Sequence, residues 1–126
     1  MASDARADIW VGIKFDGFFD QSQFVEFLDT TKMSRDERYE ILNGRPGTQG
    51  AGTIVGEDVY ETFTCCDEVK GFGVKLLWHD WDLEPKVLDF SQLTEQTEVL
   101  KKRVSRVFQK WGIQEEPLAY LHTDYR

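Results

Sequence analysis

Residues 57–66 read Glu-Asp-Val-Tyr-Glu-Thr-Phe-Thr-Cys-Cys, and residues 71–79 read Gly-Phe-Gly-Val-Lys-Leu-Leu-Trp-His, with only four residues between them. Both stretches are rich in β-branched and aromatic side chains, which predicts two consecutive strands without an intervening helix. Successive residues of a strand point to opposite faces. We therefore expect Phe72 and Trp78 on one face of the second strand, and Leu77 and His79 on the other.

The residues before this pair predict one strand followed by two short helices. Ile9–Phe15 places apolar residues at every second position, as a half-buried strand does. Asp20 and Ser34 each stand three residues before a glutamine or a glutamate, which is the capping-box pattern at the start of a helix. We expect the two helices to meet near residues 31–34 and the second to end at Gly44.

The residues after the pair predict a long helix and a last strand. The helix begins at Ser91, its apolar stripe runs from Leu93 to Trp111 at the helical period, and Gly112 ends it. Leu118–His122 then follows as a strand that closes the sheet.

The order strand, helix, strand, strand, helix, strand is that of the ferredoxin-like fold. We therefore predict an α+β protein with a four-stranded antiparallel sheet, two helical layers on one face and the other face open. The 126 residues are expected to form a single domain. Residues 44–56 contain five glycines and are expected to form a flexible loop within it.

Acidic residues outnumber basic residues, 23 to 15, and give the chain a formal net charge of −8. This charge argues against a nucleic acid as the main partner, because phosphate backbones bind basic surfaces. The sequence contains no apolar run of about 18 residues, so we expect no transmembrane helix. The adjacent Cys65 and Cys66 are a poor disulfide pair, and a reducing, cytoplasmic environment is the simplest interpretation.

The predicted topology gathers many acidic residues at one edge of the sheet. This edge collects the starts of the first and second strands and the ends of the third and fourth. Clustered like charges repel one another, and a basic protein surface that docks there would relieve the repulsion. The residues expected at this edge are Asp8, Glu57, Asp58, His79, Asp80, Asp82, Glu84 and Asp124.

The open face of the predicted sheet would carry aromatic and apolar side chains inside this acidic rim. Trp10 and Leu77 are expected there, together with Tyr60 or Tyr120. Aromatic anchors inside a charged rim are typical of protein-binding surfaces. A homodimer that packs sheet against sheet is the alternative use of this face.

Metal-dependent catalysis is a second functional hypothesis, because ligand-type side chains are assigned to the same edge. His79, Asp80 and Asp82 stand at the end of one strand, and His122 and Asp124 at the end of another. Histidine and carboxylate side chains are common ligands of divalent metals. The two histidines can share a metal only if they emerge on the same face of the sheet. A binding protein, in contrast, is expected to need neither a metal nor another cofactor.

Two segments, Ile9–Lys14 and Lys70–Leu77, resemble the first-strand and third-strand motifs of the RNA-recognition family. In this resemblance, Trp10 and Phe72 stand where the family carries aromatic residues that stack on bases. The resemblance implies RNA binding through these two rings. However, Val74 stands where the family has a further stacking aromatic residue, and the acidic composition opposes this hypothesis.

A further set of short motifs spans most of the chain: Ile9-Trp-Val-Gly12, the helix stripe of Phe24, Phe27 and Leu28, the acidic turn His79-Asp-Trp-Asp82, the helix end Gly112-Ile113 and the closing His122-Thr-Asp-Tyr125. Together they resemble the small immunity proteins of bacterial polymorphic-toxin systems. The resemblance implies a protein that blocks a toxin by tight binding without catalysis, and residues 44–56 depart from it as an insertion.

Phage-encoded inhibitors of bacterial defence complexes, such as anti-CRISPR proteins, have the same physical profile of small size, acidic charge and a ferredoxin-like fold. The sequence therefore leaves two inhibitor roles open. In both, the protein docks on a basic surface of another protein, including a nucleic-acid site that it would block by charge mimicry.

Overall fold

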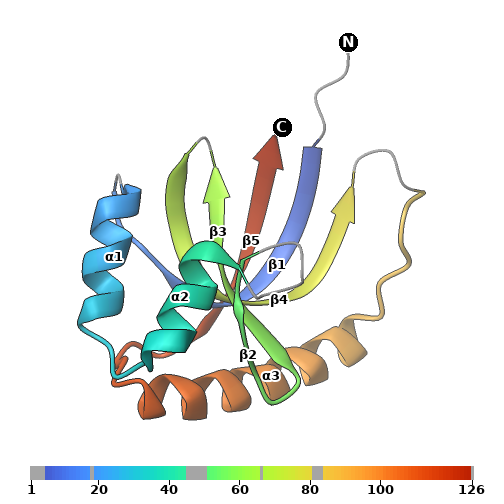
Figure 1. Cartoon of the computed structure of the whole chain (residues 1–126). Coiled ribbons are helices and arrows are strands. Elements are labelled where there is room, and N and C mark those ends of the chain that lie inside the picture. The colour runs from blue at the N-terminus through green and yellow to red at the C-terminus, as the bar shows by residue number, and fades with distance from the viewer. Residues whose placement is uncertain (1–4, 18, 45–50, 66, 81–83, 126) are drawn as a thin grey trace.

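The computed structural model describes residues 5–17, 19–44, 51–65, 67–80 and 84–125, which form an α+β structure with one antiparallel sheet (Figure 1). Five strands and three helices lie within these residues. The strands are β1 (Ala5–Lys14), β2 (Thr53–Val55), β3 (Asp58–Cys65), β4 (Glu68–Asp80) and β5 (Leu118–Tyr125). The helices are α1 (Gln21–Asp29), α2 (Arg35–Asn43) and α3 (Phe90–Lys110). None of these three helices combines the length and apolar composition that crossing a bilayer requires.

The sheet has the strand order β2-β3-β4-β1-β5, so the predicted four-stranded ferredoxin-like sheet is not confirmed. The additional strand is β2, which lies in the second half of the loop expected at residues 44–56. It pairs with β3 through Thr53 and Tyr60 and through Val55 and Asp58. Three consecutive β-branched residues form this strand, which is typical of β-structure. The glycines around them led to the prediction of a loop instead. Residues 45–50 of the expected loop lie outside the described residues.

The two short helices begin where their capping boxes predict. The Asp20 carboxylate accepts a hydrogen bond from the Gln23 amide at 2.8 Å, and the Ser34 hydroxyl accepts one from the Glu37 amide at 3.1 Å. In return, the side chains of Gln23 and Glu37 accept hydrogen bonds from the backbone amides of Asp20 and Ser34. The predicted division into two helices near residues 31–34 is thus confirmed. The third helix begins one residue before Ser91, because Asp89 caps it.

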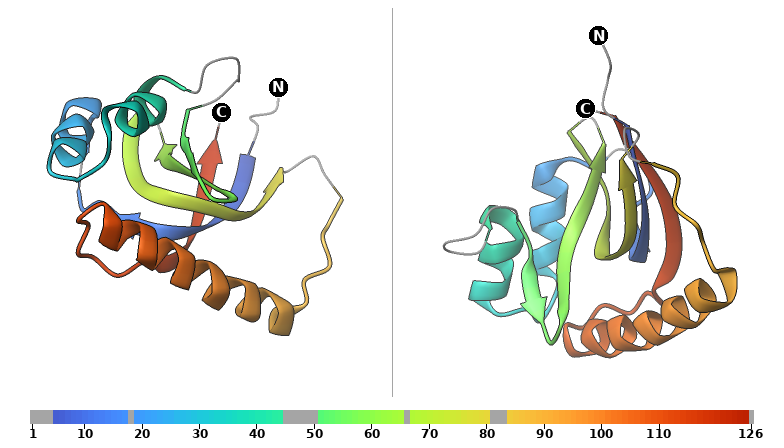
Figure 2. Two further views of the ribbon diagram at one scale, coloured as in Figure 1. Left: turned by 60° about the horizontal axis from the view of Figure 1, so that its bottom comes forward. Right: turned by 90° about the vertical axis from the view of Figure 1, so that its right-hand side faces the viewer.

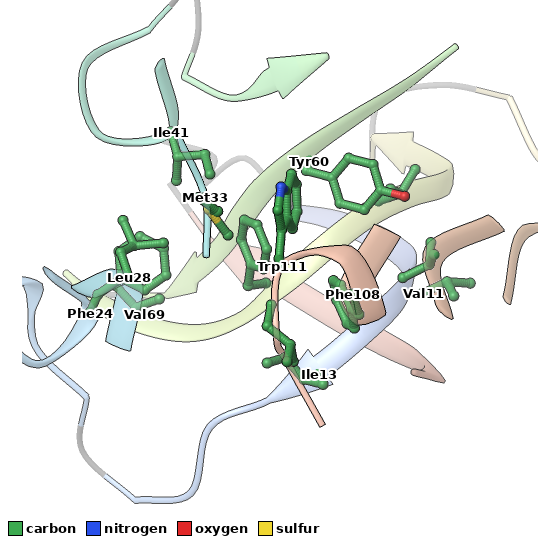
Figure 3. Packing of buried hydrophobic residues seen from close by; sticks show 14 of the residues in the cluster. Val11, Ile13, Phe24, Leu28, Met33, Ile41, Tyr60, Val69, Phe108 and Trp111 are labelled. Atoms are coloured by element: carbon green, nitrogen blue, oxygen red, sulfur yellow. The ribbon is translucent and has the colours of Figure 1, made fainter. Parts of the chain in front are cut away.

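All three helices pack on one face of the sheet and enclose the main core (Figure 3). At its centre, the Trp111 ring lies edge-on to Tyr60 with 5.0 Å between the centroids, and Phe72 stacks on Phe108 at 6.1 Å. Burial of each such side chain stabilises the fold by about 2 kcal/mol. The Trp111 indole nitrogen also donates to the Glu37 carboxylate at 3.2 Å, which joins α2 to the end of α3.

The opposite face of the sheet is not open, because the sheet curls onto itself. Phe63 of β3 lies 4.8 Å from the Trp10 ring of β1 and 5.5 Å from the His122 ring of β5. In a flat sheet of this order, β3 and β5 would be about 14 Å apart. The bend of the long strands is visible in Figure 2. As a result, Trp10 is only 2% exposed, and the prediction that this ring lies on an open face is wrong.

Glycines on β1 and β4 permit this curl. Gly12 pairs with Gly73, and a Cβ atom on either residue would overlap the backbone of the facing strand. The closest approaches would be 2.1 Å from the Gly12 Cβ to the carbonyl oxygen of Phe72 and 2.2 Å from the Gly73 Cβ to that of Val11. The two strands can bend this closely only because both positions lack a side chain.

A β-bulge in β4 changes which side chains share a face. Trp10 pairs with Lys75 but Ile9 pairs with Leu77, so Leu76 is an additional residue on β4. A shift of one residue moves every later side chain to the other face. Leu77 therefore lies with Ile9 on the helix-bearing face, and the prediction that Leu77 is on the opposite face is wrong.

Candidate functional site

The acidic residues at the start of β3 are paired with an arginine of α3. Arg103 of α3 donates two hydrogen bonds to the Asp58 carboxylate, at 2.9 and 3.1 Å, and lies 3.4 Å from the Glu57 carboxylate. Asp58 is only 8% exposed. Asp58 therefore fastens the β2–β3 hairpin to α3, and the prediction that its side chain lies on an exposed docking edge is wrong, whereas the Glu57 side chain remains 74% exposed beside Arg103.

Asp8 is also removed from the predicted surface. It lies on the curled face of the sheet, where it is 4% exposed, and its carboxylate is 3.8 Å from the His122 imidazole on β5. Neither Asp8 Oδ1 nor the two His122 ring nitrogens have a hydrogen-bond partner among the described residues. This pair belongs to the interior of the curl, beside Trp10 and Phe63.

The two histidines do not share a face. His79 pairs with Ala7 and His122 pairs with Asp8, and these neighbouring residues of β1 point to opposite sides of the sheet. The described residues contain no group of three or more side chains suited to binding a metal. The metal site that required both histidines is therefore not formed.

The burial of aromatic rings also affects the other uses of the sheet. Trp10 is 2% exposed in the curl, and Phe72 and Tyr60 are completely buried in the main core. Tyr120 lies 6.3 Å from Phe63 across the curl. The predicted base-stacking pair, Trp10 and Phe72, is inaccessible to RNA. Within the described residues, Asp8 and Trp10 on this face are buried in the curl, so the open aromatic face expected for a homodimer is not observed.

Part of the predicted acidic edge remains at one end of the sheet. Asp80 of β4 and Asp124 of β5 both pair in register with Arg6, so these positions lie on three adjacent strands. Glu84, which comes shortly after β4, is exposed. Asp82 lies outside the described residues.

An apolar groove of about 490 Å³ lies beside this end of the sheet. Its floor comes from β1, β4 and β5, and its wall comes from Pro85, Lys86 and Leu88, which precede α3. The Lys86 ammonium fixes this wall by donating to the carbonyl oxygen of Trp78 at 2.7 Å, and it lies 5.4 Å from the centre of the Trp78 ring. The main lining residues are Ile9, Leu77, Trp78, Pro85, Leu88 and Leu121.

Large apolar side chains are exposed on and next to this groove, and we call them the apolar collar. They are Trp78 (44% exposed), Val87 (99%), Leu88 (42%), Phe90 (73%) and Leu121 (77%). Three of them line the groove, Val87 lies between two lining residues in the chain, and Phe90 is the first residue of α3. Three large exposed apolar residues within positions 87–90 are unusual for a solvent-exposed segment, and this composition is the sequence signal that marks the collar.

Tyr60 is the buried titratable group with the clearest perturbation. Burial in the main core raises the pKa of its phenol, the negative charge of Asp58 raises this pKa further, and Arg103 partly opposes the change. The phenol oxygen has no hydrogen-bond partner among the described residues. Ionisation of this side chain is therefore resisted in the folded protein.

Replacing Tyr60 with phenylalanine should make the protein more resistant to alkali. A tyrosine in the unfolded chain loses its proton near pH 10, whereas Tyr60 in the folded protein keeps it. The free energy of unfolding of the natural protein therefore falls above that pH. The stability of Y60F relative to the natural protein should rise by up to about 1.4 kcal/mol per pH unit above 10. Urea unfolding between about pH 8 and about pH 11 measures this change in stability. The exposed Tyr39→Phe variant is the control, and an equal gain there would contradict the assignment.

No protein-family model, curated protein or solved structure matches this chain. The groove and its apolar collar are therefore interpreted from their own chemistry.

Proposed function

We propose that this chain is a non-enzymatic binding protein that docks on a basic surface of a protein partner through the groove and the apolar collar. The exposure of the collar carries the proposal. Large apolar side chains such as Val87 and Leu121 are exposed to water at 99% and 77% of their surface, at an energetic cost that a partner would remove. The groove beside them can receive an apolar side chain of the partner.

The charges near the collar support a basic partner. Residues 80–90 and 118–126 together carry five acidic and two basic side chains, within a chain of net charge −8. An apolar centre with a charged rim is the usual composition of a protein interface. A second copy of this chain would bring the same acidic residues to the interface, and their repulsion favours a foreign partner of opposite charge.

Within this proposal the role is that of an inhibitor, either a toxin immunity protein or a phage-type inhibitor of a defence complex. The short motifs that resemble immunity proteins support the first role, and the acidic charge supports both. The four longer strands have the antiparallel order β3-β4-β1-β5, which supports a ferredoxin-like relationship with β2 as an addition. The reducing environment inferred from the adjacent cysteines supports a cytoplasmic location.

The substitution Leu121→Glu should abolish partner binding without unfolding the protein. The side chain is 77% exposed, so the folding free energy should change by no more than about 0.5 kcal/mol. An interface anchor, in contrast, commonly contributes about 2 kcal/mol, which corresponds to a loss of affinity of about thirtyfold. Affinity capture from the lysate of cells that make the protein, at low and at high salt, measures the retained partner.

The control is Val25→Glu on α1, which is also a partly exposed apolar residue but lies away from the groove. This variant should retain the same partner as the natural protein, and high salt should release the partner from both. Equal capture by Leu121→Glu and Val25→Glu would show that the groove is not the docking site. A partner that stays bound in high salt would contradict the role of charge.

A further inference from the structure

We propose that the partner docks with an extended segment that pairs with β5 as a sixth strand of the sheet. This inference rests on the proposed function, because it specifies how the partner occupies the groove. β5 is an outer strand, and β1 pairs with it at eight consecutive positions, from Ala5 with Tyr125 to Gly12 with Leu118. The other edge of β5 carries no further strand in the part of the chain that the structure describes, so its outward backbone groups can accept one.

The two edges of the sheet differ in how they are protected. At the other edge, β2 has only three residues, and α2 covers its start. The Gly52 amide donates to the carbonyl oxygen of Glu40, and the Thr53 hydroxyl donates to the Glu40 carboxylate at 3.0 Å. β5 has eight residues, without lysine, arginine or proline, which are the residues that normally block an edge.

The side chains of β5 specify the chemistry of the added strand. Leu121 pairs with Ile9, lines the groove and is 77% exposed, while Leu118, three positions earlier in the strand, points to the opposite face and is 50% exposed. In an added strand, the side chains on the same face as Leu121 would pack beside it and extend the groove. Because the surrounding segments are acidic, lysine or arginine at the alternating positions would be attracted. The occupant is therefore an extended segment in which apolar and basic residues alternate.

A synthetic peptide of about six residues with alternating valine and lysine is a suitable probe. We expect it to shift the backbone amide resonances of β5 and of the groove in the isotope-labelled protein. It should also slow the hydrogen exchange of alternate β5 amides, because every second amide points outward. A peptide with glutamate in place of lysine should bind at least about tenfold more weakly. A valine–lysine peptide with methylated backbone nitrogens should bind too weakly to protect these amides, because it cannot donate to the outward carbonyl oxygens of β5 and its methyl groups obstruct strand pairing.

Several outcomes would overturn strand pairing. Shifts at the groove without protection of β5 amides would overturn it while leaving groove docking intact. Strand pairing would also be overturned if the peptide shifted only resonances of other surfaces, or if it did not bind at millimolar concentration. Unchanged capture of the partner by Leu121→Glu would separately overturn the proposed function. β5 amides that become protected with increasing protein concentration in the absence of peptide would identify a second copy as the occupant.

Discussion

Replacing Gly12 with alanine should destabilise the protein by more than about 4 kcal/mol, or prevent its folding. The new Cβ atom would lie 2.1 Å from the carbonyl oxygen of Phe72 and 2.7 Å from the Cα atom of Gly73. Both atoms belong to the backbone of β4, so relief requires that the two central strands separate. That movement would also open the contact between Trp10 and Phe63 in the curl. Chemical denaturation followed by circular dichroism measures the loss.

Gly56→Ala is the matched control for this prediction. Gly56 has a positive φ of 65°, but nothing lies within 4 Å of the position that its Cβ would occupy. Its replacement should cost only about 1 kcal/mol, because the cost comes from backbone conformation alone. Gly73→Ala should resemble Gly12→Ala. If Gly12→Ala and Gly56→Ala lost similar stability, the tight approach of β1 and β4 would be contradicted.

Replacing Arg103 with alanine should destabilise the protein by about 2–3 kcal/mol. The substitution removes both hydrogen-bond donors from the Asp58 carboxylate, which is 8% exposed and is left as a nearly buried, unpaired charge. Because the Arg103 side chain is itself 36% exposed, water can partly replace it, which places the expected loss below that of a fully buried pair. Thermal or urea unfolding measures the change.

Arg106→Ala is the control for the arginine prediction. Arg106 is exposed on the same helix and lies near the same hairpin turn. Its removal should change the folding free energy by no more than about 0.5 kcal/mol. A loss in Arg106→Ala as large as that in Arg103→Ala would mean that helix charge in general, and not the Asp58 contact, stabilises the hairpin.

The helices could be predicted from the sequence because their signals are local. The residues that cap α1 and α2 lie within three positions of the amides that they bind. The stripe that α3 buries, Leu100, Val104 and Phe108, repeats at the helical period in the second half of the helix. The antiparallel arrangement of the longer strands also followed from alternation and element order.

The curl of the sheet and the position of the groove could not be predicted, because they depend on pairs of residues far apart in the chain. Gly12 and Gly73 are unremarkable until β1 and β4 place them opposite each other. The extra residue Leu76 is visible only in the register, yet it determines the face on which Leu77 lies. The prediction that Asp58 lies on an exposed edge was wrong for a related reason, because its partner Arg103 lies 45 positions further along the chain.

Site-specific photo-crosslinking from the apolar collar tests whether the protein docks on a basic partner through the groove. A photoreactive side chain at position 121 or 87 should form an adduct with a basic partner protein in cell lysate, whereas the same group at position 25 on α1 should not. High salt should suppress the adduct. An equal adduct from position 25, or an adduct from position 121 that joins two copies of this chain, would contradict docking on a basic partner through the groove.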